Sequence, residues 1–144
     1  EIARKYTPLI FNKGPERSAQ RNFGASKTKG DYLLFLDADM VLTPTVIEEC
    51  VKTVQSSSFG GVIIPEKSFG KGFWAKVKTY ERSFYVGNQT IEAARFYSKK
   101  VFNEVGKFDE TITGPEDWDL SDRVSKKFDI GRIRSFILIV MIRS

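Results

Sequence analysis

Two groups of acidic residues, far apart in the sequence, could bind a metal ion and meet a substrate. Asp37 and Asp39 directly follow the apolar run 32–36, so they would leave the end of a strand and enter a loop. Hard oxygen ligands of this kind suit Mg²⁺ or Mn²⁺, which also bind the phosphates of a substrate. A metal that neutralises a departing diphosphate assists a displacement reaction. A bare Asp-x-Asp also occurs as a pair of solvated loop aspartates, so this pattern alone leaves both interpretations open.

The second acidic group is Glu116 and Asp117, which follow Gly114 and Pro115. Such a pair favours a tight turn before a helix. In the first turn of a helix the dipole lowers the pKa of a carboxylate and leaves it exposed to a substrate. The alternative is that both acids only stabilise the helix dipole.

The residue types that are missing narrow the chemistry further. The chain contains no histidine, which excludes Ser-His-Asp and Cys-His catalysis and every metal site that needs histidine. Its single cysteine, Cys50, cannot form an internal disulfide, so a reducing cytoplasm fits best. Catalysis would therefore depend on carboxylates and cations.

The charge balance favours an anionic partner. Lys and Arg number 23 against 18 Asp and Glu, which gives a net charge of +5 and would attract nucleotides, phospholipid surfaces or nucleic acid. A basic stretch interleaved with aromatic residues could meet acidic lipid headgroups or a phosphate-bearing acceptor, although a solvated basic face is the simpler interpretation. That stretch comprises Lys67, Phe69, Lys71, Phe73, Trp74, Lys76 and Lys78. Residues 1–6 do not resemble a signal peptide, and the apolar run 136–142 is too short to cross a bilayer.

The elements that must position these side chains alternate between strand and helix. Apolar runs predict strands at 7–11, 32–36, 61–65 and near 137, and helical spacing predicts helices at 16–29, 44–56, 73–85, 101–105 and 116–127. In the last helix, Trp118, Leu120 and Val124 should face inward. The alternation is typical of an α/β domain, in which ligands bind outside the carboxyl ends of parallel strands. The 144 residues fit one domain, 1–144.

Three ordered motifs resemble the family 2 glycosyltransferases of the GT-A fold. The family pattern is Ala-Arg-Asn-x-Gly, a spacer, Gly-Asp, an apolar strand and Asp-x-Asp, and this chain has Gln20-Arg-Asn-Phe-Gly24 followed by Lys29-Gly-Asp-Tyr-Leu-Leu-Phe-Leu-Asp-Ala-Asp39. Further along, Val105–Glu110 and Gly114–Arg123 resemble the Glu-Asp segment of the family. The resemblance implies a Rossmann-like, mostly parallel sheet flanked by helices. It also implies a sheet that is incomplete at the N-terminal end.

The resemblance implies a metal-assisted, inverting transfer of a sugar from a nucleotide-diphosphate donor to an acceptor hydroxyl. By it, Asp37 and Arg21 bind the donor, Asp39 binds Mg²⁺ or Mn²⁺, Asp117 is the general base and Glu116 orients the acceptor. The acceptor would be a glycan or a lipid-linked molecule, as in polysaccharide biosynthesis. The expected place is the cytoplasm or the inner face of the membrane, with a peripheral membrane contact left open and no nucleic-acid partner.

Two departures from the family pattern shape these expectations. Roughly two strand-helix units that normally come first are missing, which predicts an exposed sheet edge, half a nucleotide pocket and a chain that could be inactive alone. Many relatives also complete the metal site with a histidine on the strand after the Glu-Asp helix, where this chain has Ile137–Val140. Diphosphate and water would then be the other ligands, unless the C-terminal end is truncated or has diverged. A nucleotidyltransferase and a non-catalytic basic remnant of a transferase are the alternatives.

Overall fold

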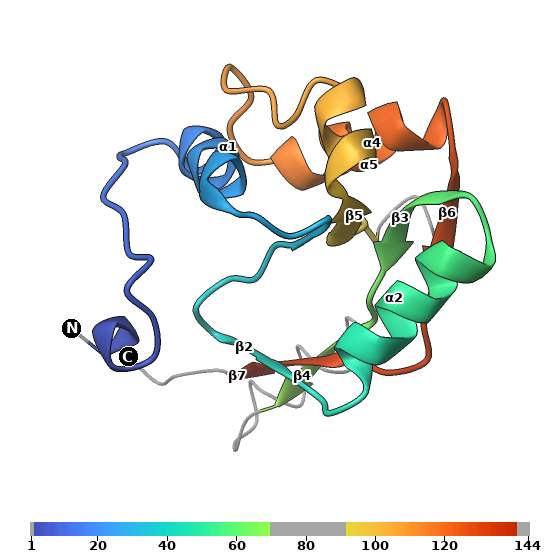
Figure 1. Cartoon of the computed structure of the whole chain (residues 1–144), viewed down its shortest axis with the longest axis horizontal. Helices are drawn as coiled ribbons and strands as arrows, with labels where there is room; N and C mark the ends of the chain where they lie inside the picture. The colour runs from blue at the N-terminus through green and yellow to red at the C-terminus, as the bar shows by residue number, and fades with distance from the viewer. Residues whose placement is uncertain (1, 70–91, 141–144) are drawn as a thin grey trace.

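The structure, a computed structural model, describes residues 2–69 and 92–140 (Figure 1). The helix predicted at 73–85 and the basic and aromatic side chains from Lys71 to Lys78 lie outside the described residues. The helices are the 3₁₀ helix η1 (Ala3–Lys5), α1 (Arg17–Lys27), α2 (Val46–Ser56), α4 (Lys99–Glu104) and α5 (Glu116–Ser125). The strands are β1 (Tyr32–Leu34), β2 (Met40–Leu42), β3 (Phe59–Ile63), β4 (Glu66–Phe69), β5 (Phe96–Ser98), β6 (Asp129–Arg132) and β7 (Ile137–Val140). Among these residues no helix has the length and apolar character that crossing a bilayer requires.

The strands form two small mixed sheets. The first has the order β1-β5-β3-β6, with β3 and β6 parallel and β5 antiparallel to both β1 and β3. Strands β1, β3 and β6 therefore run in one direction, with β5 reversed between them. The second sheet has the order β2-β7-β4 and lies below the first in Figure 1. This arrangement confirms the α/β class, with mixed sheets in place of the mostly parallel sheet expected, because β5 and β2 pair antiparallel with their neighbours. Strand β1 lies at an edge of the first sheet.

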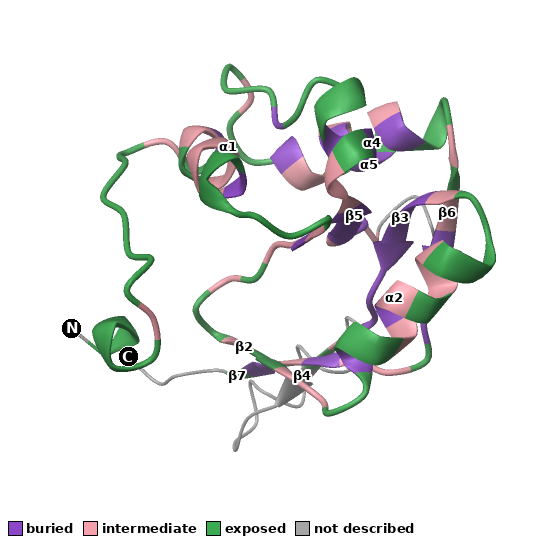
Figure 2. Ribbon diagram, in the orientation of Figure 1, coloured by how far each residue is buried: buried purple, intermediate pink, exposed green. Residues whose placement is uncertain are grey.

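Helices cover both faces of the first sheet, and the core consists of two clusters of buried side chains. Successive residues from Val62 to Ile64 belong to the two clusters in alternation. Ile63 packs with the side chains of α1, α4 and α5 in one cluster, whereas Val62 and Ile64 pack with α2 in the other. Figure 2 shows the buried residues on β3, on β5 and on the inner faces of these helices. Cys50 belongs to the second cluster, and burial raises the pKa of its thiol to about 12. It is a small buried hydrophobic residue there, as its sequence context suggested.

The predicted boundaries are right for most elements and wrong at a few. Segment 7–11 is not a strand, and Leu9 and Phe11 are exposed, because no neighbouring strand among the described residues pairs with it. Helix α2 begins at Val46, two residues later than expected. Thr43 does not cap that helix with its side chain, since its hydroxyl donates to the carbonyl of Phe136 at 2.9 Å.

The inward face of α5 was predicted correctly at two positions and wrongly at one. Leu120 and Val124 are fully buried, whereas Trp118 is 54% exposed. Because successive helical residues are about 100° apart, Trp118 lies off the stripe that Leu120 and Val124 form. The indole therefore stands at the surface beside the start of the helix.

Glu49 joins α2 to the turn between β6 and β7. Its Oε2 accepts hydrogen bonds from the backbone N–H groups of Arg134 and Ser135, both at 3.1 Å, and its Oε1 accepts one from Thr45 at 3.1 Å. The hydrogen bond from the Ser135 hydroxyl, followed by that from its backbone N–H, lowers the pKa of Glu49 to about 2. This carboxylate fixes the chain where it enters β7.

We predict that Glu49→Gln lowers the melting temperature at neutral pH. The folded-state pKa of Glu49 lies below the ordinary 4.5, so its stabilisation is complete above pH 4.5 and is lost as the pH falls towards about 2. Thermal unfolding of both proteins from pH 7 to pH 2.5 should show a difference that shrinks with acidification. Glu48→Gln is the matched control, because Glu48 forms an exposed ion pair with Lys52 on the same helix. A difference that stays constant with pH would contradict this account of Glu49.

Candidate functional site

One arginine joins the two acidic groups. Arg21 lies on α1, and its Nη1 donates to Oδ1 of Asp117 at 2.7 Å while its Nη2 donates to Oδ1 of Asp37 at 3.0 Å. Asp37 follows β1 and Asp117 lies in the first turn of α5, so side chains from three parts of the fold meet at this guanidinium. The structure therefore brings together three of the five predicted site residues, Arg21, Asp37 and Asp117.

Arg21 is held in place by its own helix and by the ring of Phe108. Helix α1 starts where Glu16 Oε2 accepts a hydrogen bond from the backbone N–H of Ser18 at 2.7 Å, which is a side-chain N-cap. The guanidinium carbon of Arg21 lies 5.3 Å from the centroid of the Phe108 ring, in range of a cation–π contact. Only 13% of the side chain is exposed. Arg21 is therefore a fixed, part-buried cation and not a solvated arginine on a helix surface.

Glu116, the fourth predicted residue, belongs to the same cluster but faces inward. Its side chain is 2% exposed, and its Oε1 lies 3.0 Å from Arg17 Nη2 and 3.5 Å from Arg21 Nη1. Neither contact has hydrogen-bond geometry, so among the described residues Glu116 is paired with these arginines by charge alone. Glu116 holds two arginines next to the candidate base, and its role towards an acceptor stays a prediction.

Two further residues of the cluster were missed by sequence reasoning. Arg95 precedes β5, and its Nε donates to Oε1 of Glu66 at 2.6 Å while its Nη1 lies 3.7 Å from Oδ2 of Asp37. The available signal was a charge inside the otherwise apolar run 93–97. Glu66 had no such signal, because an acid after a strand is ordinary loop chemistry.

Burial, and not the helix dipole, controls the candidate base. The pKa of Asp117 is raised, first because burial disfavours the charged carboxylate, while the cations of Arg21 and Arg95 oppose this shift. The lowered pKa expected from the helix N-terminus was wrong, because removal from water outweighs the dipole here. A raised pKa makes Asp117 a stronger base than a solvated aspartate.

Asp39, the fifth predicted residue, forms no ion pair with these arginines within the described part of the chain. The backbone turns after Asp37, whose carbonyl accepts from the N–H of Met40 at 3.1 Å, and the carbonyl of Asp39 accepts from the N–H of Val140 at 2.8 Å. Its side chain is exposed. Across residues 2–69 and 92–140, no three His, Cys, Asp or Glu side chains gather as a metal site. Asp39 can thus supply one accessible carboxylate, and the phosphates of a substrate would have to supply further ligands.

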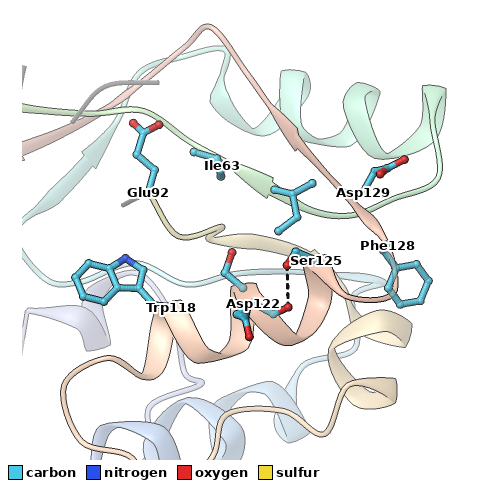
Figure 3. Close-up of a pocket in the computed structure, with 9 residues that line it drawn as sticks. Ile63, Glu92, Trp118, Asp122, Ser125, Phe128 and Asp129 are labelled. Atoms are coloured by element: carbon cyan, nitrogen blue, oxygen red, sulfur yellow. Dashed lines mark hydrogen bonds between the residues drawn. The ribbon is translucent and has the colours of Figure 1, made fainter. Parts of the chain in front are cut away.

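Two cavities flank this cluster. The first, of about 360 Å³, lies along the edge strand β1 and is lined by Arg21, by residues of α1 and by apolar side chains that include Leu9 and Phe11. The second, of about 510 Å³, lies between α5 and the strands β3 and β6. In the second cavity Trp118 and Glu92 lie at one end and Asp129 at the other (Figure 3). A cation therefore borders the first cavity, whereas an aromatic ring and carboxylates border the second.

Asn22, next to Arg21, braces the loop that carries Phe108. Its Oδ1 accepts a hydrogen bond from the backbone N–H of Phe108 at 3.0 Å, and its Nδ2 donates to the Phe108 carbonyl at 2.9 Å and to Glu110 Oε1 at 3.0 Å. One amide side chain thus satisfies both backbone groups of the residue whose ring lies under Arg21. Asn22 therefore links α1 to the loop that carries Phe108.

Comparison with known proteins identifies the family of this chain. The family model described as glycosyl transferase family 2 matches residues 1–109. The uncharacterized glycosyltransferase YwdF of Bacillus subtilis (strain 168) is 25% identical over 135 residues, which cover 87% of this chain and 50% of YwdF.

A solved structure with a similar fold is S. aureus TarS 1–349 in complex with UDP-GlcNAc. The TM-score is 0.66 at 15% sequence identity, and the match covers 99% of this chain and 46% of that chain. This likeness confirms the GT-A fold that the motifs implied. The chain spans about half the length of both proteins.

We predict that Asn22→Leu destabilises the fold by about 1–3 kcal/mol, because the backbone groups of Phe108 lose their partners. Urea unfolding measures the change in free energy. Gln20→Leu is the control, since Gln20 is on the same helix and makes one exposed bond of 3.4 Å to the carbonyl of Pro15. Equal losses in the two variants would show that Asn22 does not brace the loop.

Proposed function

Because the chain belongs to glycosyl transferase family 2, we propose that it carries the donor-binding and catalytic side chains for sugar transfer from a nucleotide-diphosphate sugar. The acceptor is a hydroxyl of a glycan or a lipid-linked molecule, and the transfer inverts the anomeric carbon. The activity proposed is that of the whole protein, since the chain spans about half the length of its relatives.

The observation that carries this proposal is the contact of Arg21 with both acidic motifs. Asp37 and Asp117 are far apart in the sequence, yet they lie on two nitrogens of the same guanidinium. The donor held by one carboxylate and the acceptor deprotonated by the base must meet in a single displacement, so the two carboxylates must lie close together. Two unrelated surface acids would have no reason to share a buried cation.

In the proposed reaction Asp117 accepts the proton of the acceptor hydroxyl. The acceptor oxygen forms a bond to the anomeric carbon, and the bond from that carbon to the diphosphate oxygen breaks with its electron pair on the leaving group. Attack from the opposite face in one displacement inverts the configuration. Burial raises the pKa of Asp117, which strengthens the base, and the proton finally rests on its carboxylate.

Positive charge would stabilise the leaving nucleoside diphosphate. Arg21 lines the cavity along β1, so its guanidinium is the protein cation that we place near the diphosphate, and Asp37 orients the nucleotide. Asp39 offers an exposed carboxylate for Mg²⁺ or Mn²⁺, and the bound metal would supply Lewis-acid stabilisation of the departing phosphate oxygens. Metal binding at Asp39 would depend on the phosphates of the donor, because the described residues offer no preformed cluster of three ligands.

The two cavities suggest where the substrates lie. The apolar and aromatic lining of the cavity along β1, with Arg21 at its border, suits a nucleotide base joined to a diphosphate. The cavity beside α5 has Trp118, two serines and carboxylates in its lining, which suits a polyhydroxylated acceptor and repels a free diphosphate. TarS was solved with UDP-GlcNAc, so a UDP-sugar is the first donor to test.

We predict that Asp117→Asn in the full-length protein lowers turnover by about 10²–10⁴-fold, the usual contribution of a general base. Release of UDP from UDP-GlcNAc and other UDP-sugars in the presence of acceptor measures it. Glu48→Gln, on α2 and in an exposed pair with Lys52 away from both cavities, should leave turnover unchanged. Normal turnover by a folded Asp117→Asn protein would exclude this residue as the base.

We also predict that Asp39→Asn weakens the binding of UDP in the presence of Mn²⁺ and leaves binding without metal unchanged. Calorimetry with UDP and GDP, each with and without Mn²⁺, measures both. Heat for neither nucleotide under any condition would instead favour a non-catalytic remnant. Nucleotidyl transfer without sugar transfer from the same donors would contradict the proposed reaction class.

A further inference from the structure

We propose that Arg95, anchored by Glu66, is a positioning residue that orients Asp37 and balances the negative charge around Asp117. Its importance for turnover rests on the proposed function, whereas its placement does not. Neither residue belongs to the motifs that identified the site. Both were brought to it by the fold.

The backbone of Arg95 is hydrogen-bonded to the neighbouring chain segment on each side. Its N–H donates to the carbonyl of Val62 at 3.1 Å, and its carbonyl accepts from the N–H of Phe35 at 3.0 Å. Phe35 is two residues before Asp37. The side chain of Arg95 therefore starts from a point that is tied both to the central strand β3 and to the segment that carries the donor-binding aspartate.

The side chain is fixed as well. Glu66 Oε1 holds Nε at 2.6 Å, only 13% of Arg95 is exposed, and Nη1 lies 3.7 Å from Asp37 Oδ2. That Nη1 is buried, and the described residues offer it no hydrogen-bond partner. It acts on Asp37 through charge across a short, part-buried distance, where Coulomb attraction is stronger than in water.

The charge balance of the cluster shows why a cation is needed in addition to Arg21. Four carboxylates and three guanidinium groups gather there: Asp37, Glu66, Glu116 and Asp117 with Arg17, Arg21 and Arg95. Arg21 alone contacts three of these acids. Carboxylates that are crowded without enough cations protonate, and a protonated Asp117 cannot accept the proton of a hydroxyl.

Among the described residues, the groups that face Asp117 come from three other parts of the fold as well as from α5 itself. They are Arg21 on α1, Asp37 after β1, Arg95 and the buried phenol of Tyr97 at β5, and Glu116 on the same helix. Burial, Glu116 and Asp37 raise the pKa of Asp117, and Arg21 and Arg95 lower it. Loss of the Arg95 charge should therefore raise this pKa further, and loss of the Glu66 charge should lower it, because the cation then acts uncompensated.

The test is a carboxyl NMR titration of the full-length protein with ¹³C-labelled aspartate, in which Asp117→Asn assigns the signal. Arg95→Met keeps much of the side-chain volume without charge, and the pKa of Asp117 should shift upward. Glu66→Gln should shift it downward, and Arg95→Lys should keep it near the value of the unmodified protein. The titration needs no donor or acceptor, so it can fail independently of the proposed sugar transfer.

Arg132→Met is the matched control, because Arg132 forms a part-buried pair with Glu92 that includes none of the cluster residues. It should leave the pKa of Asp117 unchanged. If Arg95→Met only lowers the melting temperature and leaves that pKa in place, Arg95 is a structural residue and the inference is overturned. If Arg95→Met does not fold, Glu66→Gln and Arg95→Lys decide: a downward shift in the first and an unchanged pKa of Asp117 in the second support the inference, and no shift in Glu66→Gln overturns it.

Discussion

The structure depends on one ion bridge, in which the guanidinium of Arg21 lies between Asp37 and Asp117. A planar group with several N–H donors in a fixed geometry can hold two carboxylates at once, which a lysine could not do in the same way. The bridge is part-buried, so breaking it would leave charges in a poorly hydrated place. It fixes the relative position of α1, the end of β1 and the start of α5.

The surrounding residues serve to keep that bridge in place. Asn22 ties the loop of Phe108 to α1, so the ring stays under Arg21. On the opposite side, Arg123 donates to the carbonyl of Lys107 at 2.7 Å and to Asp119, which ties α5 to the same loop. Side-chain hydrogen bonds therefore fix the loop that carries Phe108 from both α1 and α5, as expected where geometry matters for chemistry.

The sequence predicted the parts of the site that are local and missed those that depend on the fold. Asp37, Asp117 and Arg21 were found because each lies in an ordered motif at the end of a recognisable element. The place of Arg95 could not be found in this way, because it depends on β5 running antiparallel between β1 and β3. Local rules also gave the wrong pKa direction for Asp117, since burial is a property of the assembled core.

A double-mutant cycle between Arg21 and Asp117 tests the central claim most directly. Arg21→Met, Asp117→Asn and the double variant would be unfolded in urea, and the coupling free energy obtained from the four proteins. A part-buried, charge-assisted contact predicts a coupling of about 0.5–3 kcal/mol. Changes that add to within about 0.3–0.5 kcal/mol would mean that the two residues do not touch, and the site as described here would not exist.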